Sequence, residues 1–278
     1  MASASAAVVI TVAALTPAGQ DPAPAVSTDH TPHANVVASP DAAIGQLVSG
    51  MPADSVSIAA QNLTTSQSYR HGADTKVAAA SVIKLDILET LLLQQQDEDE
   101  PLTDAETAQA TAMIENSDND SATQLWNEVG GAAGIRAADI RLGASGTHPD
   151  PKGYWGLSTT DADDQLTLLR DLVAPASPLN PASQAFALGL MRQVEPDQAW
   201  GISAVADPGT ATALKNGWLP VDDDNGLWAI GSVGIITLHG EQVLVAVLTQ
   251  HDDSQGDGIE LTQALARTLV PSITTPLR

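Results

Sequence analysis

Cysteine is absent from this chain of 278 residues, and aromatic residues make up only 3% of it. The absence of cysteine excludes disulfides, thiol nucleophiles and cysteine metal sites together. Because aromatic side chains are so few, a core must be built from alanine, leucine, valine and isoleucine, for which an apolar content of 43% is sufficient. The length allows one large domain or two small ones.

Basic residues are also scarce, since 11 lysines and arginines stand against 34 aspartates and glutamates, for a net charge of −23. A surface this negative repels nucleic acid and anionic lipid, so we expect neither as a partner. Only four of the basic residues are lysines. Two of these four lie in the short motifs described below.

Long hydrophobic runs are missing as well. The N-terminal stretch MASASAAVVITVAALTPAGQDPAPAV holds one apolar run, too short to span a bilayer, followed by small residues of the kind that a signal peptidase cleaves. It lacks the basic segment that precedes such a run in a secretory signal. We predict that residues 1–36 are a signal-like or disordered tail and linker, that the chain is secreted or associated with the cell envelope, and that its mature form has no membrane span.

Residues 37–272 have the pattern of a folded domain, and residues 273–278 that of a short tail. Helical spacing of apolar residues occurs over residues 41–51, 81–96, 103–116, 121–131, 159–174, 181–194 and 258–273. Strand patterns occur over residues 55–63, 68–73, 210–218, 226–238 and 242–250. This order predicts an α/β fold, more narrowly an α+β sandwich. One antiparallel sheet is built from both ends of the chain, and an all-helical subdomain of about residues 85–200 is inserted beside it.

Three local signals set helix boundaries. Thr103 and Glu106 have the spacing of a capping box, which predicts a helix start. Gly130 and Gly131 are expected to stop the helix before them. Thr160 or Asp161 is expected to cap the helix that follows.

Ser81 and Lys84 lie three residues apart in the apolar stretch AAASVIKLDILETLLLQQQ. Positions i and i+3 share a helix face, so the lysine amine is able to reach the serine hydroxyl. Serine needs an adjacent base to act as a nucleophile, and burial near a helix N-terminus lowers the pKa of a lysine. The spacing is common by chance, and the alternative is a solvent-facing lysine at a helix start.

Two further polar motifs follow. Ser117, Asp118 and Asn119 lie between two predicted helices, where polar residues often only turn the chain or cap the next helix. Lys215, in KNGW, enters a predicted strand, where it is alternatively an ordinary edge-strand charge. S-x-x-K, S-D-N and K-x-G in this order form a trio known from class A β-lactamases and penicillin-binding proteins. On these motifs the chain resembles the class A serine β-lactamases and their relatives among D,D-peptidases.

The surrounding sequence extends this resemblance over roughly residues 40–272. SVSIAAQNLTTSQSYRHGADTKVAAASVIKL resembles the family's first hairpin and nucleophile helix, and MIENSDNDSATQLWNEVGG its S-D-N segment. The stretch from LKNGWLP to GLWAIGSVGIITLHGEQVLVAVLTQ is similar to its last strands. The resemblance implies a β-lactamase/transpeptidase-like fold.

The resemblance also implies roles for the residues that react. Ser81 would be the acylated nucleophile, Lys84 its general base, and Ser117 a proton relay toward the leaving nitrogen. The backbone N–H groups of Ser81 and Trp218 would form an oxyanion hole, which stabilises the tetrahedral intermediate.

Substrate binding is implied for four more residues. Asn119 would contact the substrate amide, and Lys215 would place positive charge near the substrate carboxylate. Asn216 and Gly217 complete the K-x-G motif, in which Asn216 stands where the family mostly has threonine or serine. An amide still donates a hydrogen bond, but with another geometry than a hydroxyl.

The loop that should activate the deacylating water departs from the family. Class A enzymes carry a glutamate there in an E-x-x-L-N pattern, whereas RLGASGTHPDPKGYWGLSTTDADD is shorter and contains neither glutamate nor asparagine. His148, Asp150 and Tyr154 are candidates for a replacement base, or ordinary loop residues. Glu195 is a further polar candidate without a motif. The link from Ser81 to Ser117 is also shorter than usual, and no clear arginine follows KNG.

These observations leave three hypotheses. The first is a serine hydrolase with β-lactamase-like activity, which is acylated by β-lactams or esters and turns over slowly. The second is a cell-wall D,D-peptidase or an esterase, and the third a binding protein that kept the fold and lost turnover. We expect a small β-lactam or acyl or peptide substrate, no cofactor, no metal and a monomer. His30 and His33 lie in the tail and are not expected to bind a metal.

Overall fold

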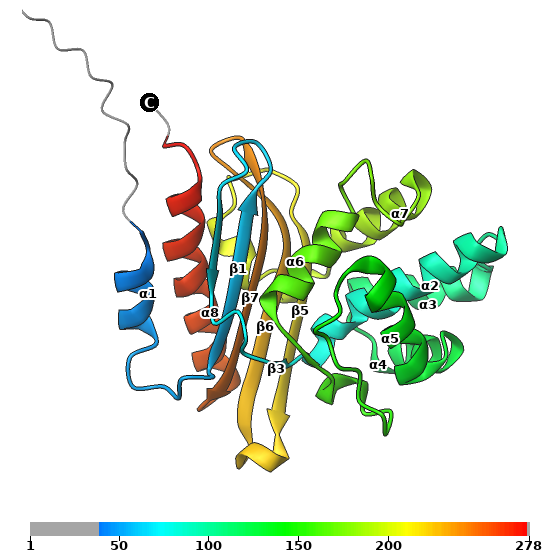
Figure 1. Cartoon of the computed structure of the whole chain (residues 1–278), viewed down its shortest axis with the longest axis horizontal. Coiled ribbons are helices and arrows are strands. Elements are labelled where there is room, and N and C mark those ends of the chain that lie inside the picture. The colour runs from blue at the N-terminus through cyan, green and yellow to red at the C-terminus, as the bar shows by residue number, and fades with distance from the viewer. Residues whose placement is uncertain (1–38, 277–278) are drawn as a thin grey trace, which may run out of the picture. The chain divides into compact units, whose positions relative to one another are not determined.

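The computed structural model describes residues 39–276, so the predictions for residues 1–36 and for the last two residues lie outside the described part. Five strands form one antiparallel sheet in the order β2-β1-β7-β6-β5 (Figure 1). Their bounds are β1 Val56–Asn62, β2 Ser68–His71, β5 Ala213–Val221, β6 Leu227–Leu238 and β7 Glu241–Asp252. Two short strands, β3 Val77–Ala78 and β4 Thr159–Thr160, pair with each other.

The sheet joins the two ends of the folded region. β1 pairs with β7 from Val56 opposite Thr249 to Asn62 opposite Val243. β5 pairs with β6 alone, so its other side is free to face the segment that carries Ser81. The predicted antiparallel sheet built from both chain ends is confirmed.

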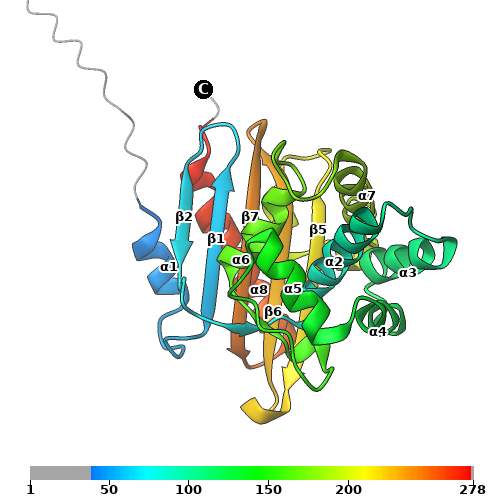
Figure 2. The same cartoon turned by 45° about the vertical axis from the view of Figure 1, so that its right-hand side comes forward.

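Helices cover both faces of this sheet. Their bounds are α1 Asp41–Leu47, α2 Lys84–Glu98, α3 Asp104–Glu115, α4 Asn119–Glu128, α5 Gly131–Leu142, α6 Ala162–Asp171, α7 Pro181–Met191 and α8 Gln255–Leu269. α8 and α1 pack on one face, and α6 lies on the other, beside the group formed by α2, α3, α4, α5 and α7 (Figures 1 and 2). Each face has its own apolar core, rich in leucine, isoleucine, valine and alanine. Within residues 39–276, no helix is long and apolar enough to cross a membrane.

The local signals have mixed outcomes. The capping box of Thr103 and Glu106 is confirmed, and Asp161 is the N-cap of α6. The predicted helix stop is confirmed, since α4 ends at Glu128 and Gly130 has a left-handed conformation (φ 93°). The helix α5, which begins at Gly131 directly after it, was not predicted. The helix predicted over residues 81–96 is also corrected. Residues 80–83 form a 3₁₀ turn, and the α-helix begins only at Lys84.

Candidate active site

Ser81 lies on the 3₁₀ turn that leads into α2, next to strand β5. The preceding residue, Ala80, has a positive φ of 47°, a conformation that costs energy for a residue with a side chain. A Cβ added to Gly217 would lie 2.7 Å from the backbone nitrogens of Ser81 and Val82. Glycine is therefore required at position 217, because only its backbone allows the strand and the turn to approach so closely.

Lys84 is fully buried and bonds to the connection between α3 and α4. Its Nζ donates to the Ser117 carbonyl oxygen at 2.6 Å, to Ser117 Oγ at 3.1 Å and to Asn119 Oδ1 at 2.8 Å. The expected contact with Ser81 is not made, and within residues 39–276 the Ser81 hydroxyl has no hydrogen-bond partner. The physical reason is that all three N–H donors of a charged lysine are already used.

Ser117 connects the two buried lysines. Lys215, on β5 and fully buried, donates to Ser117 Oγ at 3.0 Å and to the carbonyl oxygen of Asn216 at 2.8 Å. Ser117 has a positive φ of 55°, which turns the chain sharply between α3 and α4. The S-x-x-K, S-D-N and K-x-G motifs, far apart in sequence, thus meet at one hydroxyl.

Asp118 has a different task in the same motif. Its carboxylate accepts the backbone N–H of Ser121 at 2.7 Å and so caps α4. Hydrogen bonds from Ser121 lower the pKa of Asp118, and the nearby positive charge of Lys84 contributes further. The helix-capping interpretation therefore holds for Asp118, while its neighbours Ser117 and Asn119 bond to Lys84.

Burial changes the acidity of both lysines. Loss of hydration lowers the pKa of Lys84 to about 7, against the opposing charge of Asp118. Burial also lowers the pKa of Lys215 well below its usual value, and the positive charge of Lys84 adds to this effect. A lysine with a pKa near 7 is partly neutral at neutral pH, so Lys84 is able to accept a proton.

Trp155 covers Lys84 from the loop between α5 and α6, and sequence reasoning did not select it. Lys84 Nζ lies 4.9 Å from the centroid of the Trp155 ring, and the indole Nε1–H donates to Thr123 Oγ1 at 3.1 Å. A cation over an aromatic face is attracted by the ring quadrupole. The only sequence signal for Trp155 was the scarcity of aromatic residues. With so few of them in the chain, a tryptophan in the loop that departs from the family pattern is unusual.

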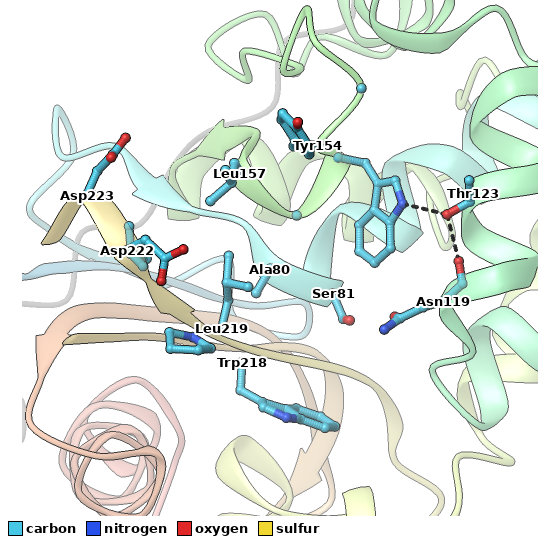
Figure 3. Close-up of a pocket in the computed structure, with 15 residues that line it drawn as sticks. Ala80, Ser81, Asn119, Thr123, Tyr154, Leu157, Trp218, Leu219, Asp222 and Asp223 are labelled. Atoms are coloured by element: carbon cyan, nitrogen blue, oxygen red, sulfur yellow. Dashed lines mark hydrogen bonds between the residues drawn. The ribbon is translucent and has the colours of Figure 1, made fainter. Parts of the chain in front are cut away.

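A cleft of about 600 Å³ opens beside Ser81 (Figure 3). Its lining comprises Ala80, Ser81, Asn119, Thr123, residues 153–157 and residues 218–223. The close-up shows Ser81 between Asn119 on one side and Trp218 on the other. The ring of Trp218 also packs edge-on against Trp200, with ring centroids 6.0 Å apart.

The loop candidates are placed differently from one another. Tyr154 lines the cleft, whereas His148 pairs through its backbone with Thr159. The Asp150 carboxylate accepts the backbone N–H groups of Lys152 and Tyr154, both at 2.9 Å, and so shapes the loop itself. Neither His148 nor Asp150 lines the cleft.

Two other polar side chains lie apart from the cleft. Glu195 is bonded to Asn116, whose Nδ2 donates to Glu195 Oε1 at 3.2 Å. Asn216 differs from expectation, since its side chain is buried and its Nδ2 donates to the carbonyl oxygens of Gln198 and Trp200 at 2.8 and 3.1 Å. These bonds tie β5 to the neighbouring loop and leave the amide no free N–H for a substrate. In the described part of the chain, no group of histidine, aspartate or glutamate side chains is arranged to hold a metal ion.

The chain is similar in sequence or in structure to several known proteins. Proteins named "Putative lipoprotein LppW" from Mycobacterium tuberculosis and Mycobacterium bovis are 26% identical over 225 residues, which is 78% of this chain and 70% of those proteins. The structure of PBP-A is similar with a TM-score of 0.71 at 22% identity, over 84% of this chain and 95% of PBP-A. A β-lactamase from Chitinophaga pinensis has a TM-score of 0.71 at 16% identity, over 84% of this chain and 99% of that enzyme.

At these identities the solved structures show a shared fold, which is the predicted β-lactamase/transpeptidase-like one. The model of the β-lactamase enzyme family matches residues 107–273, more than half of the chain. The matched range includes the S-D-N and K-x-G motifs, and Ser81 and Lys84 precede it in sequence but meet it in space. The chain belongs to the β-lactamase enzyme family.

Proposed function

We propose that this protein is a serine hydrolase, acylated on Ser81 by β-lactams or related acyl compounds. One observation carries the proposal. Two buried lysines, Lys84 and Lys215, are joined through the hydroxyl of Ser117 next to a serine that lines an open cleft. Burying two cationic side chains this close together is costly, and a role in proton transfer accounts for it.

Acylation begins with Ser81. Its Oγ attacks the substrate carbonyl carbon while its proton passes to neutral Lys84, which gives a tetrahedral oxyanion and a charged lysine. To accept the proton, Lys84 must be in its neutral form, with a lone pair turned toward Ser81. The backbone N–H groups of Ser81 and Trp218 are suited to bind the oxyanion, because Gly217 keeps β5 against the turn.

Collapse of the intermediate needs a proton on the leaving nitrogen. Ser117 Oγ donates that proton as the C–N bond breaks, and takes a replacement from Lys84 along their 3.1 Å hydrogen bond. This step returns Lys84 to its neutral form and leaves an ester on Ser81. Lys215, bonded to the same hydroxyl, favours a partial negative charge on Ser117 during the transfer.

Release of the acyl group is proposed to be slow. Deacylation needs a base that activates water, and the side chain over Lys84 is the indole of Trp155 rather than a carboxylate. The carboxylate of Asp150 is held by loop N–H groups. Tyr154, which lines the cleft, is the remaining loop candidate.

Intact-protein mass spectrometry after addition of benzylpenicillin tests both parts of the proposal. We expect a stoichiometric adduct on the wild-type chain, absent from Ser81→Ala, that persists much longer than it takes to form. The absence of an adduct on the wild type would contradict acylation. An adduct that clears as fast as it forms would contradict slow release and direct attention to Tyr154.

The missing loop glutamate favours a second candidate, a D,D-peptidase or esterase acting on cell-wall peptides or esters. Such an enzyme also forms an acyl-serine, but its natural acyl donor is not a β-lactam. Nitrocefin hydrolysis compared with release of D-alanine from a peptide ending in D-Ala-D-Ala separates the two. Failure of both reactions in a folded protein favours a binding protein that lost turnover.

We also propose an association with the cell envelope. The mycobacterial relatives carry the word lipoprotein in their name, and β-lactams and cell-wall peptides are found outside the cytoplasm. Fractionation of the source cells, with immunodetection of the chain, is the test. Recovery of the protein only from the cytoplasmic fraction would contradict this proposal.

A further inference from the structure

The cleft extends from Ser81 in one direction along β5. Lys215 lies two residues before Gly217, which touches the turn of Ser81, and Asp222 lies five residues after it. β5 ends at Val221, roughly 13 Å beyond Gly217 at a rise of about 3.3 Å per residue, and Asp222 begins the turn that follows. Ser117, the proposed proton donor to the leaving group, is bonded to Lys215. The leaving group therefore belongs on the Lys215 side, and the acyl side chain of a substrate belongs in the cleft on the Asp222 side.

Between Ser81 and the turn of Asp222, apolar side chains form much of the cleft wall. Tyr154 and Leu157 come from the loop, and Leu219 and Pro220 come from β5. Tyr154 is 63% exposed and Leu157 43%, and they are two of the four large hydrophobic side chains that are exposed in the described part of the chain. Exposed apolar side chains that line a cleft indicate that an apolar group binds there.

The far end of the cleft is acidic. Asp222 and Asp223 are exposed on the turn between β5 and β6 and accept no hydrogen bond or ion pair from residues 39–276, whereas their neighbour Asp224 is bonded to His251 Nδ1 at 2.6 Å. No lysine or arginine lines the cleft. Figure 3 shows both aspartates at the opposite end from Ser81, with Leu219 and Ala80 between. Charge complementarity thus favours a cation at this end.

We propose that the cleft from Tyr154 to Asp223 takes the acyl arm of the substrate and selects arms that are apolar along their length and end in an ammonium group. The inference rests on the proposed function, because it assumes that Ser81 attacks the carbonyl to which the arm is attached. It names a substrate class: amides, esters or β-lactams whose acyl group carries an amine about three to four extended residues away from the reactive carbonyl.

Four penicillins with the same nucleus test the arm. They are 6-aminopenicillanic acid acylated with acetyl, hexanoyl, 6-aminohexanoyl and adipoyl groups. The last three have arms of matched length that end in a methyl, an ammonium and a carboxylate. We expect the second-order rate constant for acylation of Ser81 to rise from acetyl to hexanoyl and to be highest for 6-aminohexanoyl. The ammonium arm should exceed the carboxylate arm by about tenfold at low salt, with the ratio shrinking as salt is added.

Two double variants test whether the preference for an ammonium arm comes from the acidic end of the cleft. The double variant Asp222→Asn/Asp223→Asn should bring the ammonium and carboxylate arms to nearly equal rates. The matched control is Asp74→Asn/Asp99→Asn, which removes two exposed charges that do not line the cleft and should keep the ratio. Equal rates for all arms on the wild type, or a ratio that both double variants lower alike, would overturn the proposal.

A binding measurement separates this inference from the proposed function. The Ser81→Ala variant is unable to form the ester, so calorimetric titration with the same penicillins reports on the cleft alone. The same order of affinities is expected there. If the wild type is not acylated but Ser81→Ala shows this order, the proposed function fails and the arm preference stands. If acylation occurs and no order is seen in either measurement, the arm preference fails and the proposed function stands.

Discussion

Lys84 and Asp86 lie two residues apart on α2, and both are fully buried, but their surroundings differ. Lys84 faces three acceptors at hydrogen-bond distance. Asp86 belongs to a carboxylate cluster on helices α2, α5 and α6. The cluster consists of Asp86, Glu89, Asp139, Asp164 and Asp171. On one side of α2 the buried lysine therefore has hydrogen-bond partners. On the other side, several buried carboxyl groups lie together with few hydrogen-bond donors.

Hydrogen bonding in the carboxylate cluster is incomplete. Both carboxylate oxygens of Glu89 and of Asp139 lack a partner within residues 39–276. Asp86 accepts one good hydrogen bond, from Gln165 Nε2 at 3.1 Å. The positive charges of Arg136, Lys76 and Arg170 act on Asp139, Asp164 and Asp171 respectively, but in each case burial has the larger effect.

The difference leads to opposite responses to protons. Burial raises the pKa of Asp86 to about 7 and that of Asp139 to about 9, and it raises the pKa of Glu89 well above its usual value. Burial lowers the pKa of Lys84 to about 7. Near neutral pH, both sides of α2 thus tend toward uncharged groups. On the lysine side this creates a base, and on the acid side it makes stability depend on pH.

Removal of the base has the largest expected effect. Lys84→Met should lower the rate of Ser81 acylation by about 10³-fold, since a positioned general base contributes about 10²–10⁴-fold. Lys84→Arg is the matched control, because arginine keeps the charge but does not release its proton in a protein. Both variants should be equally slow in stopped-flow or mass-spectrometric acylation. Retention of most of the rate in Lys84→Arg would show that charge, not proton transfer, is what position 84 supplies.

Stability should fall as pH rises from about 4 to about 9. In this range the folded state keeps protons on Asp86, Glu89 and Asp139 that the unfolded chain has lost, and each lowers the free energy of unfolding by up to about 1.4 kcal/mol per pH unit. The lowered pKa values of Lys84 and Lys215 act in the opposite sense, because there the unfolded chain holds the extra proton, and for Lys84 this applies only above about pH 7. We expect the carboxyl groups to decide the direction, because five of them with raised pKa values stand against these two lysines. Thermal unfolding at several pH values checks the direction, and a midpoint that rises from about pH 5 to about pH 8 would contradict it.

Neutral isosteres sharpen the same test. Glu89→Gln should increase the free energy of unfolding by about 1–3 kcal/mol at about pH 8 and have little effect at about pH 4, because the acid is then uncharged in both states. Asp74→Asn, at an exposed position, should show no such difference. Urea unfolding of both variants at the two pH values gives the comparison. Equal effects of Glu89→Gln at both pH values would mean that Glu89 does not titrate as described.

A smaller effect is expected from Trp155. Trp155→Leu should admit water to Lys84 and raise its pKa by less than about one unit, because lost burial outweighs the lost attraction to the ring. The pH at which acylation is half-maximal should then move upward. Thr123→Val, which removes only the hydrogen bond to the indole, should move it less. A downward shift in Trp155→Leu would show that the ring mainly stabilises the charged lysine.

Much of the architecture could be predicted from the sequence, because apolar periodicity and capping residues act locally. The strands and Thr103 belong to this class, and the three motifs identified the family before any geometry was known. What the sequence could not supply depends on contacts between distant segments. Lys84 bonds to Ser117 and Asn119 rather than to its near neighbour Ser81, because the distant connection between α3 and α4 supplies acceptors for all three of its N–H donors.

Asn216 and Trp155 also show that a motif does not determine which groups a side chain contacts. Asn216 matched a substrate-binding motif, yet its amide bonds to the backbone of Gln198 and Trp200, which no motif encodes. Trp155 matched no motif, yet it covers the buried lysine. The partners of a side chain depend on tertiary packing, and a residue pattern alone does not specify them.

The pH dependence of acylation tests the central claim, which is that buried Lys84 acts as a neutral base for Ser81. The rate of adduct formation with benzylpenicillin, measured by mass spectrometry on the wild type, should rise with pH and reach half of its maximum near pH 7, where the pKa of Lys84 lies. A rate that is constant from about pH 5.5 to about pH 8.5, or one that falls across this range, would contradict the account.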